Sequence, residues 1–214
     1  SRSSTFSCLG CGAIFNDHNL LYSNVQKGMS RAIERHPFLQ VGQQGKLNNE
    51  TVILTARIRY RMQCEEWDEE DRFYRQEDWL YDEWVLCSPY NEYYLSEYEG
   101  ELELQMPMPS SPLASIDWTA SSLPLQDRKQ ARVLVRGIAS ITSMEGEVPW
   151  ELPDTGTLRV LEYVDGSRTG SVEADIDDDG AAEPEFYLGQ PIAAEAVRAI
   201  FNLPAESLTI TRDH

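Results

Sequence analysis

Residues 51–61 read TVILTARIRYR, a stretch rich in β-branched residues in which Ile58 and Tyr60 alternate with arginines. Alternation of apolar and polar residues is the pattern of a half-buried strand. Further strand-like stretches follow along the chain, at 84–87, 93–96, 102–104, 132–135, 157–164, 170–173 and 185–188. The sequence therefore predicts a mainly β protein, built of two curled sheets or small barrels.

The chain divides into four segments by composition. They are a knuckle-like, helical N-terminal segment (1–38), a first β half (39–105), a Pro/Ser-rich connector (106–130) and a second β half with a C-terminal helix (131–214). The two β halves are similar in size, and each carries a Glu-aromatic pair on one of its strands: Glu83-Trp84 in the first and Glu162-Tyr163 in the second. This similarity indicates a pseudo-repeat.

Two helices are expected, one near each end. Apolar residues four positions apart, from Leu21 to Ile33, stack on one helical face and predict a helix over about 20–35. Pro191 near a first helical position, followed by an apolar face that reaches Ile200, predicts a short helix that ends near Phe201.

The charge balance limits the classes of partner. The 214 residues include 36 acidic and 18 basic side chains, for a net charge of −18. Nucleic acids and anionic membranes need a basic surface, so both are excluded as non-specific partners. A basic protein surface, a polyamine or a metal cation is a better match as a partner for this negative charge.

The sequence has no apolar run long enough for a transmembrane helix. Its four cysteines fit a reducing, cytoplasmic setting.

The acidic residues are densest where the aromatic residues are also densest. Fifteen carboxylates lie between Glu65 and Glu103, against two arginines. Aromatic faces attract a cation and carboxylates neutralise it, so this region is a candidate partner-binding surface. Its candidate residues are Trp67, Trp79, Glu83, Trp84, Tyr94 and Glu97. The alternative is plain alternation on a half-exposed sheet, with aromatic residues inward and carboxylates outward.

Two short motifs are candidate metal sites. Cys8-x-x-Cys11-Gly12 has the spacing that holds one edge of a tetrahedral Zn²⁺, with further ligands from His18, His36, Cys64, Cys87 or another subunit. A metal-free knuckle is the alternative.

The second motif is Asp175-x-Asp177-x-Asp179-Gly180, which matches the first half of a calcium loop. Its twelfth position is Phe186 rather than a bidentate Glu, so a solvated hairpin tip is the alternative.

Several stretches together resemble one family. They are Ile58-Arg59-Tyr60-Arg61, Asp82-Glu83-Trp84, Tyr94-Leu95-Ser96-Glu97, Glu145-Gly146-Glu147-Val148-Pro149-Trp150, Ser171-Val172-Glu173 and Glu185-Phe186-Tyr187-Leu188-Gly189. In this order, over about 40–200, the chain resembles the bacterial domain-of-unknown-function family 4178. The resemblance implies a β-rich fold and an accessory role, linked to membrane-stress or polyamine-related systems. It also implies a zinc-ribbon-like N-terminus, which is incomplete here because no second C-x-x-C follows Cys11 before Leu39.

The motifs of common enzymes are missing from the sequence. It has no phosphate-binding loop, nucleophile elbow or H-E-x-x-H, and its three histidines lie in the terminal segments. We therefore expect a non-catalytic adaptor that joins a larger assembly through a protein partner or a second copy of itself. A polyamine- or metal-binding sensor is the alternative. A hydrolase is the third possibility, and it requires a pocket in which two carboxylates converge.

Overall fold

The computed structural model describes residues 5–7, 14–16, 23–24, 33–150, 152, 155–166, 168–176 and 183–204. Its elements are β1 (Thr5–Ser7), β2 (Ile14–Asn16), β3 (Ser23–Asn24), β4 (Gln44–Leu47), β5 (Glu50–Asp68), β6 (Phe73–Cys87), β7 (Glu92–Tyr98), β8 (Glu101–Pro107), β9 (Ser122–Pro124), β10 (Gln130–Val148), β11 (Thr157–Asp165), β12 (Arg168–Asp175), β13 (Glu185–Pro191) and α1 (Ala194–Phe201). The prediction of a mainly β protein is confirmed, and so is the short C-terminal helix that ends at Phe201. Pro191, however, is the last residue of β13 and not near the first helical position, because the helix begins at Ala194.

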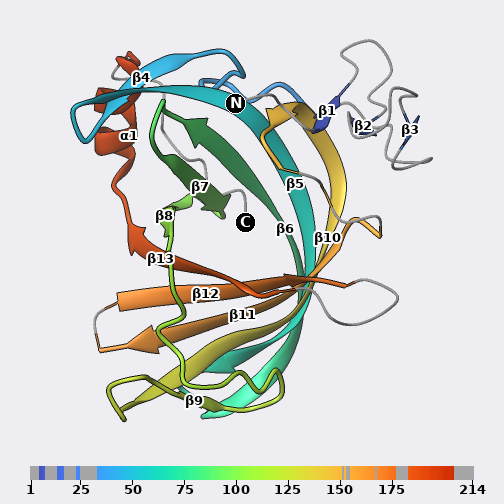
Figure 1. Ribbon diagram of the computed structural model, residues 1–214, viewed down its shortest axis with the longest axis vertical. Coiled ribbons are helices and arrows are strands. Elements are labelled where there is room, and N and C mark those ends of the chain that lie inside the picture. Colours follow the sequence, from blue (N-terminus) through green and yellow to red (C-terminus); the bar gives the residue numbers. More distant parts are fainter. Residues whose placement is uncertain are drawn as a thin grey trace.

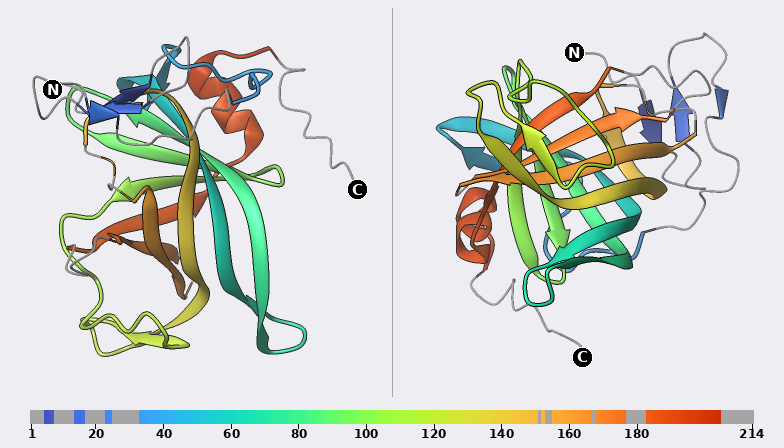
Figure 2. Two further views of the ribbon diagram at one scale, coloured as in Figure 1. Left: turned by 90° about the vertical axis from the view of Figure 1, so that its right-hand side faces the viewer. Right: turned by 90° about the horizontal axis from the view of Figure 1, so that it is seen from below.

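Eight antiparallel strands close into one barrel (Figure 1). The order around it is β5-β6-β7-β8-β13-β12-β11-β10, and β10 pairs back with β5. Viewed from below, the strands surround a common interior (Figure 2). The two predicted β halves therefore share a single barrel, because the first and last strands of each half pair with those of the other.

The predicted pseudo-repeat has a counterpart in the topology. Strands β5 to β8 form one four-stranded meander, and β10 to β13 form a second. Each begins with a strand of 19 residues, and these two long strands pair antiparallel with each other. The closing strands, β8 and β13, also pair antiparallel. The two meanders therefore meet first strand to first strand and last strand to last strand.

The register of the strands defines the two faces of the barrel wall. Directly opposed residues on neighbouring strands share a face, so Ile58, Tyr60 and Met62 on β5 lie on the same face as Glu83, Tyr81 and Trp79 on β6. This is the inner face, and its apolar residues from β5 and β10 form a buried cluster.

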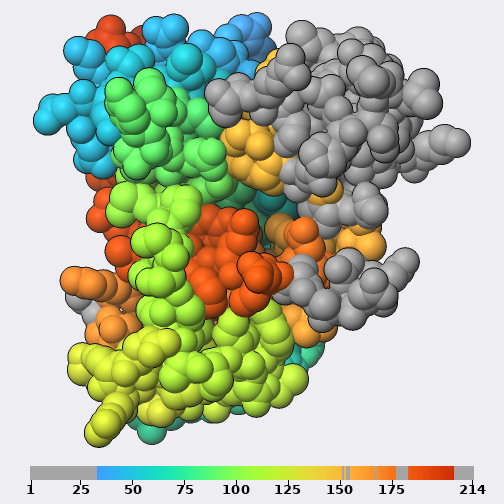
Figure 3. All heavy atoms as spheres, in the orientation of Figure 1, coloured from blue at the N-terminus to red at the C-terminus, as the bar shows by residue number. Residues whose placement is uncertain are grey.

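The outer face of each half has its own cover. Helix α1 packs over the first half with β4, above a cluster that contains Trp84. The connector and β9 cover the second half, above a cluster that contains Tyr163. The connector follows β8, whose last residue, Pro107, pairs with Tyr187 of β13. In Figure 3 the connector, in yellow-green, covers the lower part of the molecule. Because both outer faces are covered, the aromatic residues of the two Glu-aromatic pairs are buried on the side opposite their glutamates.

Most of the predicted N-terminal helix (20–35) lies outside the described residues. Of the helices that the structure does describe, none is long and apolar enough to cross a membrane.

Candidate functional site

Three glutamates from three strands have their side chains on the inner face. Glu83 on β6 opposes Ile58, whereas Glu162 on β11 opposes Ser171, and Glu173 on β12 opposes Val160. Each occupies an inner position because its strand alternates, and its neighbours in sequence face outward. Glu83, for example, lies between outward-facing Asp82 and Trp84, which belong to the salt bridges and packing of the outer face.

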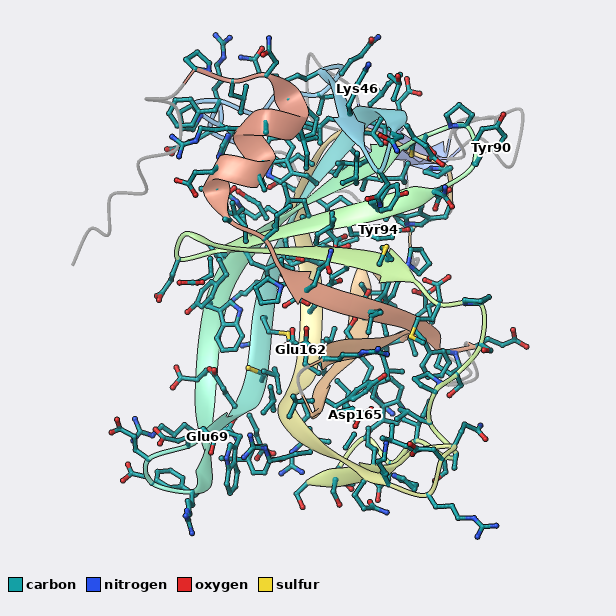
Figure 4. The ribbon with its side chains drawn as sticks, turned by 90° about the vertical axis from the view of Figure 1, so that its left-hand side faces the viewer. Lys46, Glu69, Tyr90, Tyr94, Glu162 and Asp165 are labelled. Carbon is teal, nitrogen blue, oxygen red and sulfur yellow. The ribbon has the colours of Figure 1, made fainter. Side chains whose placement is uncertain are left out.

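Two cavities lie inside the barrel, with volumes of about 130 Å³ and 270 Å³. Glu83 and Glu173 line both, so the cavities meet at these two side chains. Figure 4 places Tyr94, which lines the first cavity, and Glu162, which lines the second, in the central part of the molecule. The barrel interior is therefore partly hollow, and Glu162 lines the larger of these two cavities.

The charge of the cavity walls is one-sided. Nine carboxyl groups line the two cavities: Glu66, Glu83, Glu101, Glu103, Glu162, Glu173, Asp175, Glu183 and Glu185. Among the lining residues that the structure describes, none is Lys, Arg or His. Such a space has a strongly negative potential and favours a cation.

Glu83 is the most unusual of these residues. Its exposed fraction is 8%, and it forms no hydrogen bond or ion pair with any described residue. Burial raises the pKa of its carboxyl group to about 7. Burying an acid without a hydrogen-bond or charge partner is costly, so the position lacks the compensation that buried carboxylates normally have.

The other two central glutamates are shifted in the same direction. Burial, followed by the charges of Glu103 and Glu66, raises the pKa of Glu162 to about 7. Burial, followed by the charge of Glu83, raises the pKa of Glu173 well above its ordinary value. Burial therefore disfavours the charged form of all three carboxyl groups, and a cation beside them would favour it.

Two carboxylates of β6 on the outer face, Asp82 and Asp78, form ion pairs with arginines of β5. Asp82 lies 2.5 Å from the Arg57 guanidinium and 2.7 Å from that of Arg59. Burial would raise the pKa of Asp82, but the hydrogen bonds from Arg59 and Arg57 hold it below its ordinary value. Arg61 likewise pairs with Asp78 at 2.6 Å. The alternating arginines of β5 are therefore used on the outer face and leave the interior without a counter-charge.

Tyrosine rings form much of the remaining cavity wall. Tyr60 and Tyr81 are stacked, with ring centroids 5.1 Å apart, and Tyr94 meets Tyr187 edge to face at 5.2 Å. Burial raises the pKa of each of these tyrosines, so all four remain neutral. Neutral rings offer electron-rich faces to a cation.

The six predicted partner-binding residues do not form one surface. Trp79, Glu83 and Tyr94 have inner-face positions and line the cavities. Trp84 is buried on the other face beneath His36, which also contacts Glu97 at 3.3 Å.

The remaining one, Trp67, lies near the end of the β5–β6 hairpin against Tyr74. Glu69 marks the turn of this hairpin in Figure 4, far from the cavity residues. The structure thus brings together only the inner-face half of the predicted set.

The predicted metal ligands lie mostly outside the described residues. This holds for Cys8, Cys11, Asp177 and Asp179, whereas Asp175 lines the smaller cavity. Within the described part of the chain, no three His, Cys, Asp or Glu side chains are arranged to hold a metal ion.

The two described cysteines have separate environments. Burial raises the pKa of the Cys64 thiol, which opposes Gly137, to about 12. The Cys87 sulfur lies 3.5 Å from the Thr55 hydroxyl. His36, another of the candidate zinc ligands, accepts a hydrogen bond from the backbone N–H of Leu39.

Glu162, Glu173 and Tyr187 line the cavities but were not among the predicted site residues. A signal for the first was present, because Glu162-Tyr163 repeats the Glu83-Trp84 pair. In both halves the structure places the glutamate inward and the aromatic residue outward, and the glutamate opposes a serine, Ser96 or Ser171.

One comparison with known proteins gives a match. The family described as "Domain of unknown function (DUF4178)" matches residues 40–194, which cover all eight barrel strands. No curated protein and no solved structure matches the chain.

Proposed function

The chain belongs to the family described as "Domain of unknown function (DUF4178)", and on that premise we propose that it is a non-catalytic binding module whose barrel holds a small cationic ligand. The family description names no activity, so the proposal depends on the barrel interior. The ligand occupies the two cavities that meet at Glu83 and Glu173.

The environment of Glu83 carries the proposal. Its carboxyl group is buried, lines both cavities and lacks a partner among the described residues. A cation in the cavity supplies the missing counter-charge and recovers the free energy that burial costs. A merely structural interior position is better filled by an apolar residue such as Val85, two positions along the same face.

A hydrolase has one observation in its favour. Glu83 and Glu173 line one pocket, and a hydrolase requires such a pair of carboxyl groups. Acid–base catalysis by two carboxyl groups, however, needs environments that push their pKa values apart. Here burial raises both, and no described basic residue of the cavity keeps one of them ionised. Hydrolysis of a glycoside or ester that Glu173→Gln abolishes would support catalysis instead.

The role of adaptor in a larger assembly stays a prediction. Its support is the outer part of β6, where Phe73 and Leu80 have exposed fractions of 49% and 55%. These side chains lie on the projecting β5–β6 hairpin, so a protein partner can reach them without entering the barrel. Ligand binding in the interior and docking through the hairpin are compatible with each other.

Calorimetry and thermal shift with a panel of cations test the binding function. The panel contains tetramethylammonium, butylamine, 1,4-diaminobutane, spermidine, arginine amide and Ca²⁺, each added to the full chain at pH 8 and low salt. We expect at least one cation to bind and to raise the melting temperature. Glu83→Gln should weaken that binding at least tenfold.

The matched control is Glu70→Gln. Glu70 is an exposed acid in the turn of the β5–β6 hairpin, so this variant removes the same charge without altering the cavities. Its affinity should equal that of the unchanged protein. A panel with no binder, or equal losses in both variants, would overturn the proposal.

A further inference from the structure

We infer that the ligand is a linear polyamine, a flexible chain with several ammonium groups, that extends through both cavities and has an inner ammonium between Glu83 and Glu173. This inference rests on the proposed function and names its ligand class.

The carboxyl groups are spread along the interior in three sets. Glu83 and Glu173 lie in the middle, where they line both cavities. The smaller cavity adds Asp175, Glu183 and Glu185 at one end, and the larger adds Glu66, Glu101, Glu103 and Glu162 at the other. A ligand that matches this pattern carries charge at both ends and in the middle.

The spacing along the strands fits such a ligand. Residues on one face of a strand, such as Glu101 and Glu103, repeat about every 6.5–7 Å. Three or four methylene groups separate two ammonium nitrogens by about 5–6 Å at standard bond lengths. The charges of an extended polyamine and the carboxyl groups of the cavity walls therefore have similar periods.

A metal ion fits the same space less well. Calcium and magnesium require several oxygen atoms that converge on one point. Among the described residues no three acidic side chains converge in this way, although nine line the cavities. Separate charges along an elongated space call for a ligand with separate charges.

The walls between the carboxyl groups suit methylene segments. Tyr60, Tyr94 and Tyr187 line the smaller cavity, and Trp79 and Tyr81 line the larger. Aromatic faces bind both the alkyl chain and the polarised CH₂ groups beside an ammonium. With volumes of about 130 Å³ and 270 Å³, the cavities hold a slender chain more readily than a folded peptide.

Glu83 supplies independent evidence that this acidic space is a site. Its exposed fraction of 8% makes it more than nine-tenths buried, and it has no partner among the described residues. Because its side chain lines both cavities, an ammonium beside it also lies beside Glu173. One inner ammonium of a polyamine therefore neutralises two acids that are otherwise without a counter-charge.

A graded series of amines tests the inference. We would measure affinities by calorimetry at pH 8 for butylamine, 1,4-diaminobutane, spermidine and spermine, which carry one to four amino groups. We expect each added ammonium, up to spermidine, to strengthen binding about tenfold. Glu83→Gln and Glu173→Gln should each weaken spermidine binding at least tenfold, whereas Glu70→Gln should leave it unchanged.

Failure of the inference is distinguishable from failure of the proposed function. If butylamine or tetramethylammonium binds as tightly as spermidine, or if only Ca²⁺ binds, the polyamine assignment is wrong and a cation-binding interior stands. If none of these compounds binds, both are wrong. If spermidine binding survives Glu83→Gln and Glu173→Gln but weakens in Glu70→Gln, it takes place at the surface and the inference is overturned.

Discussion

Asp82 and Glu83 are adjacent acids with opposite surroundings. Asp82 has two arginine partners on the outer face, whereas Glu83 has none among the described residues of the interior. The exposed fraction of both is 8%. A one-residue step along a strand therefore separates a carboxylate that stabilises the fold from one that is available to a ligand.

Asp82→Asn should destabilise the protein strongly. The change leaves Arg57, whose exposed fraction is 3%, without its charged partner, although its guanidinium still lies over the Trp84 ring at 4.9 Å. Removing one member of a buried pair costs about 3–5 kcal/mol because the other charge stays buried. Urea denaturation at pH 7 measures the change in the free energy of unfolding.

Asp78→Asn is the matched control for Asp82→Asn. It breaks the Arg61–Asp78 ion pair, a neighbouring pair on the same two strands that is largely exposed. Exposed pairs contribute about 0–1 kcal/mol, so this variant should remain close to the unchanged protein. Equal effects of the two substitutions would show that the Arg57–Asp82–Arg59 cluster does not stabilise the barrel.

At the scale of elements, local patterns predicted the strands but not their full lengths. The alternation at 51–61 belongs to β5, which runs from residue 50 to 68. Its second half carries Gln63, Glu65 and Glu66, polar residues that give no apolar period. They remain in a strand because β6 and β10 pair with them on both sides, and such long-range pairing is absent from the local sequence.

The pairing of β5 with β10 closes the barrel and depends on a glycine. Gly137 lies opposite Cys64, and a Cβ atom at Gly137 would approach the Gln63 carbonyl oxygen to 2.3 Å and the Cys64 Cβ to 2.5 Å. Gly137→Ala should therefore cost about 2–4 kcal/mol, because the obstructing atoms belong largely to the backbone of the paired strand.

Ser140→Ala provides the comparison for Gly137→Ala. Ser140 lies on the same strand and also pairs with both β5 and β11, but truncating its side chain adds no atom to the interface. Chemical denaturation should place it within about 0.5 kcal/mol of the unchanged protein. If Gly137→Ala were equally stable, the close approach of β10 to β5 would not be required for closure.

At the scale of the molecule, the sequence predicted a cation-binding region between Glu65 and Glu103 but placed it on the surface of the protein. The inward direction of Glu83 contradicts the simple alternative for residues 65–103, in which aromatic residues face inward and carboxylates outward. Glu162 and Glu173, outside that region, also face inward. Strand parity places Glu83 on the face of Tyr81 and opposite to that of Trp84, so part of the aromatic set faces each way. The alternation of residues between the two faces of a strand can be read from the sequence. Which face becomes the interior depends on the closure by β10 and β13.

The buried acids should give the ligand-free protein an unusual pH dependence. Burial raises the pKa of Glu83 and Glu162 from 4.5 to about 7, so the folded state binds more protons than the unfolded state between these values. Stability is then fully present below about pH 4.5 and is lost as the pH rises through about 7. Asp82, whose pKa is lowered, has the opposite effect on stability: its contribution is lost only as the pH falls below about 4.

Thermal and urea denaturation from pH 4.5 to 8.5 therefore tests the barrel as a whole. We expect the free energy of unfolding to fall across this range without ligand, and to fall less in Glu83→Gln, which removes one of the raised groups. Spermidine should restore stability most at pH 8, because a cation binds the ionised acids and displaces their protons. Calorimetry in buffers of different ionisation enthalpy should accordingly show proton release on binding near pH 7. A flat stability profile, unchanged by Glu83→Gln, would mean that the three inner glutamates are ionised and compensated in the free protein, and the cation would have no role in the interior.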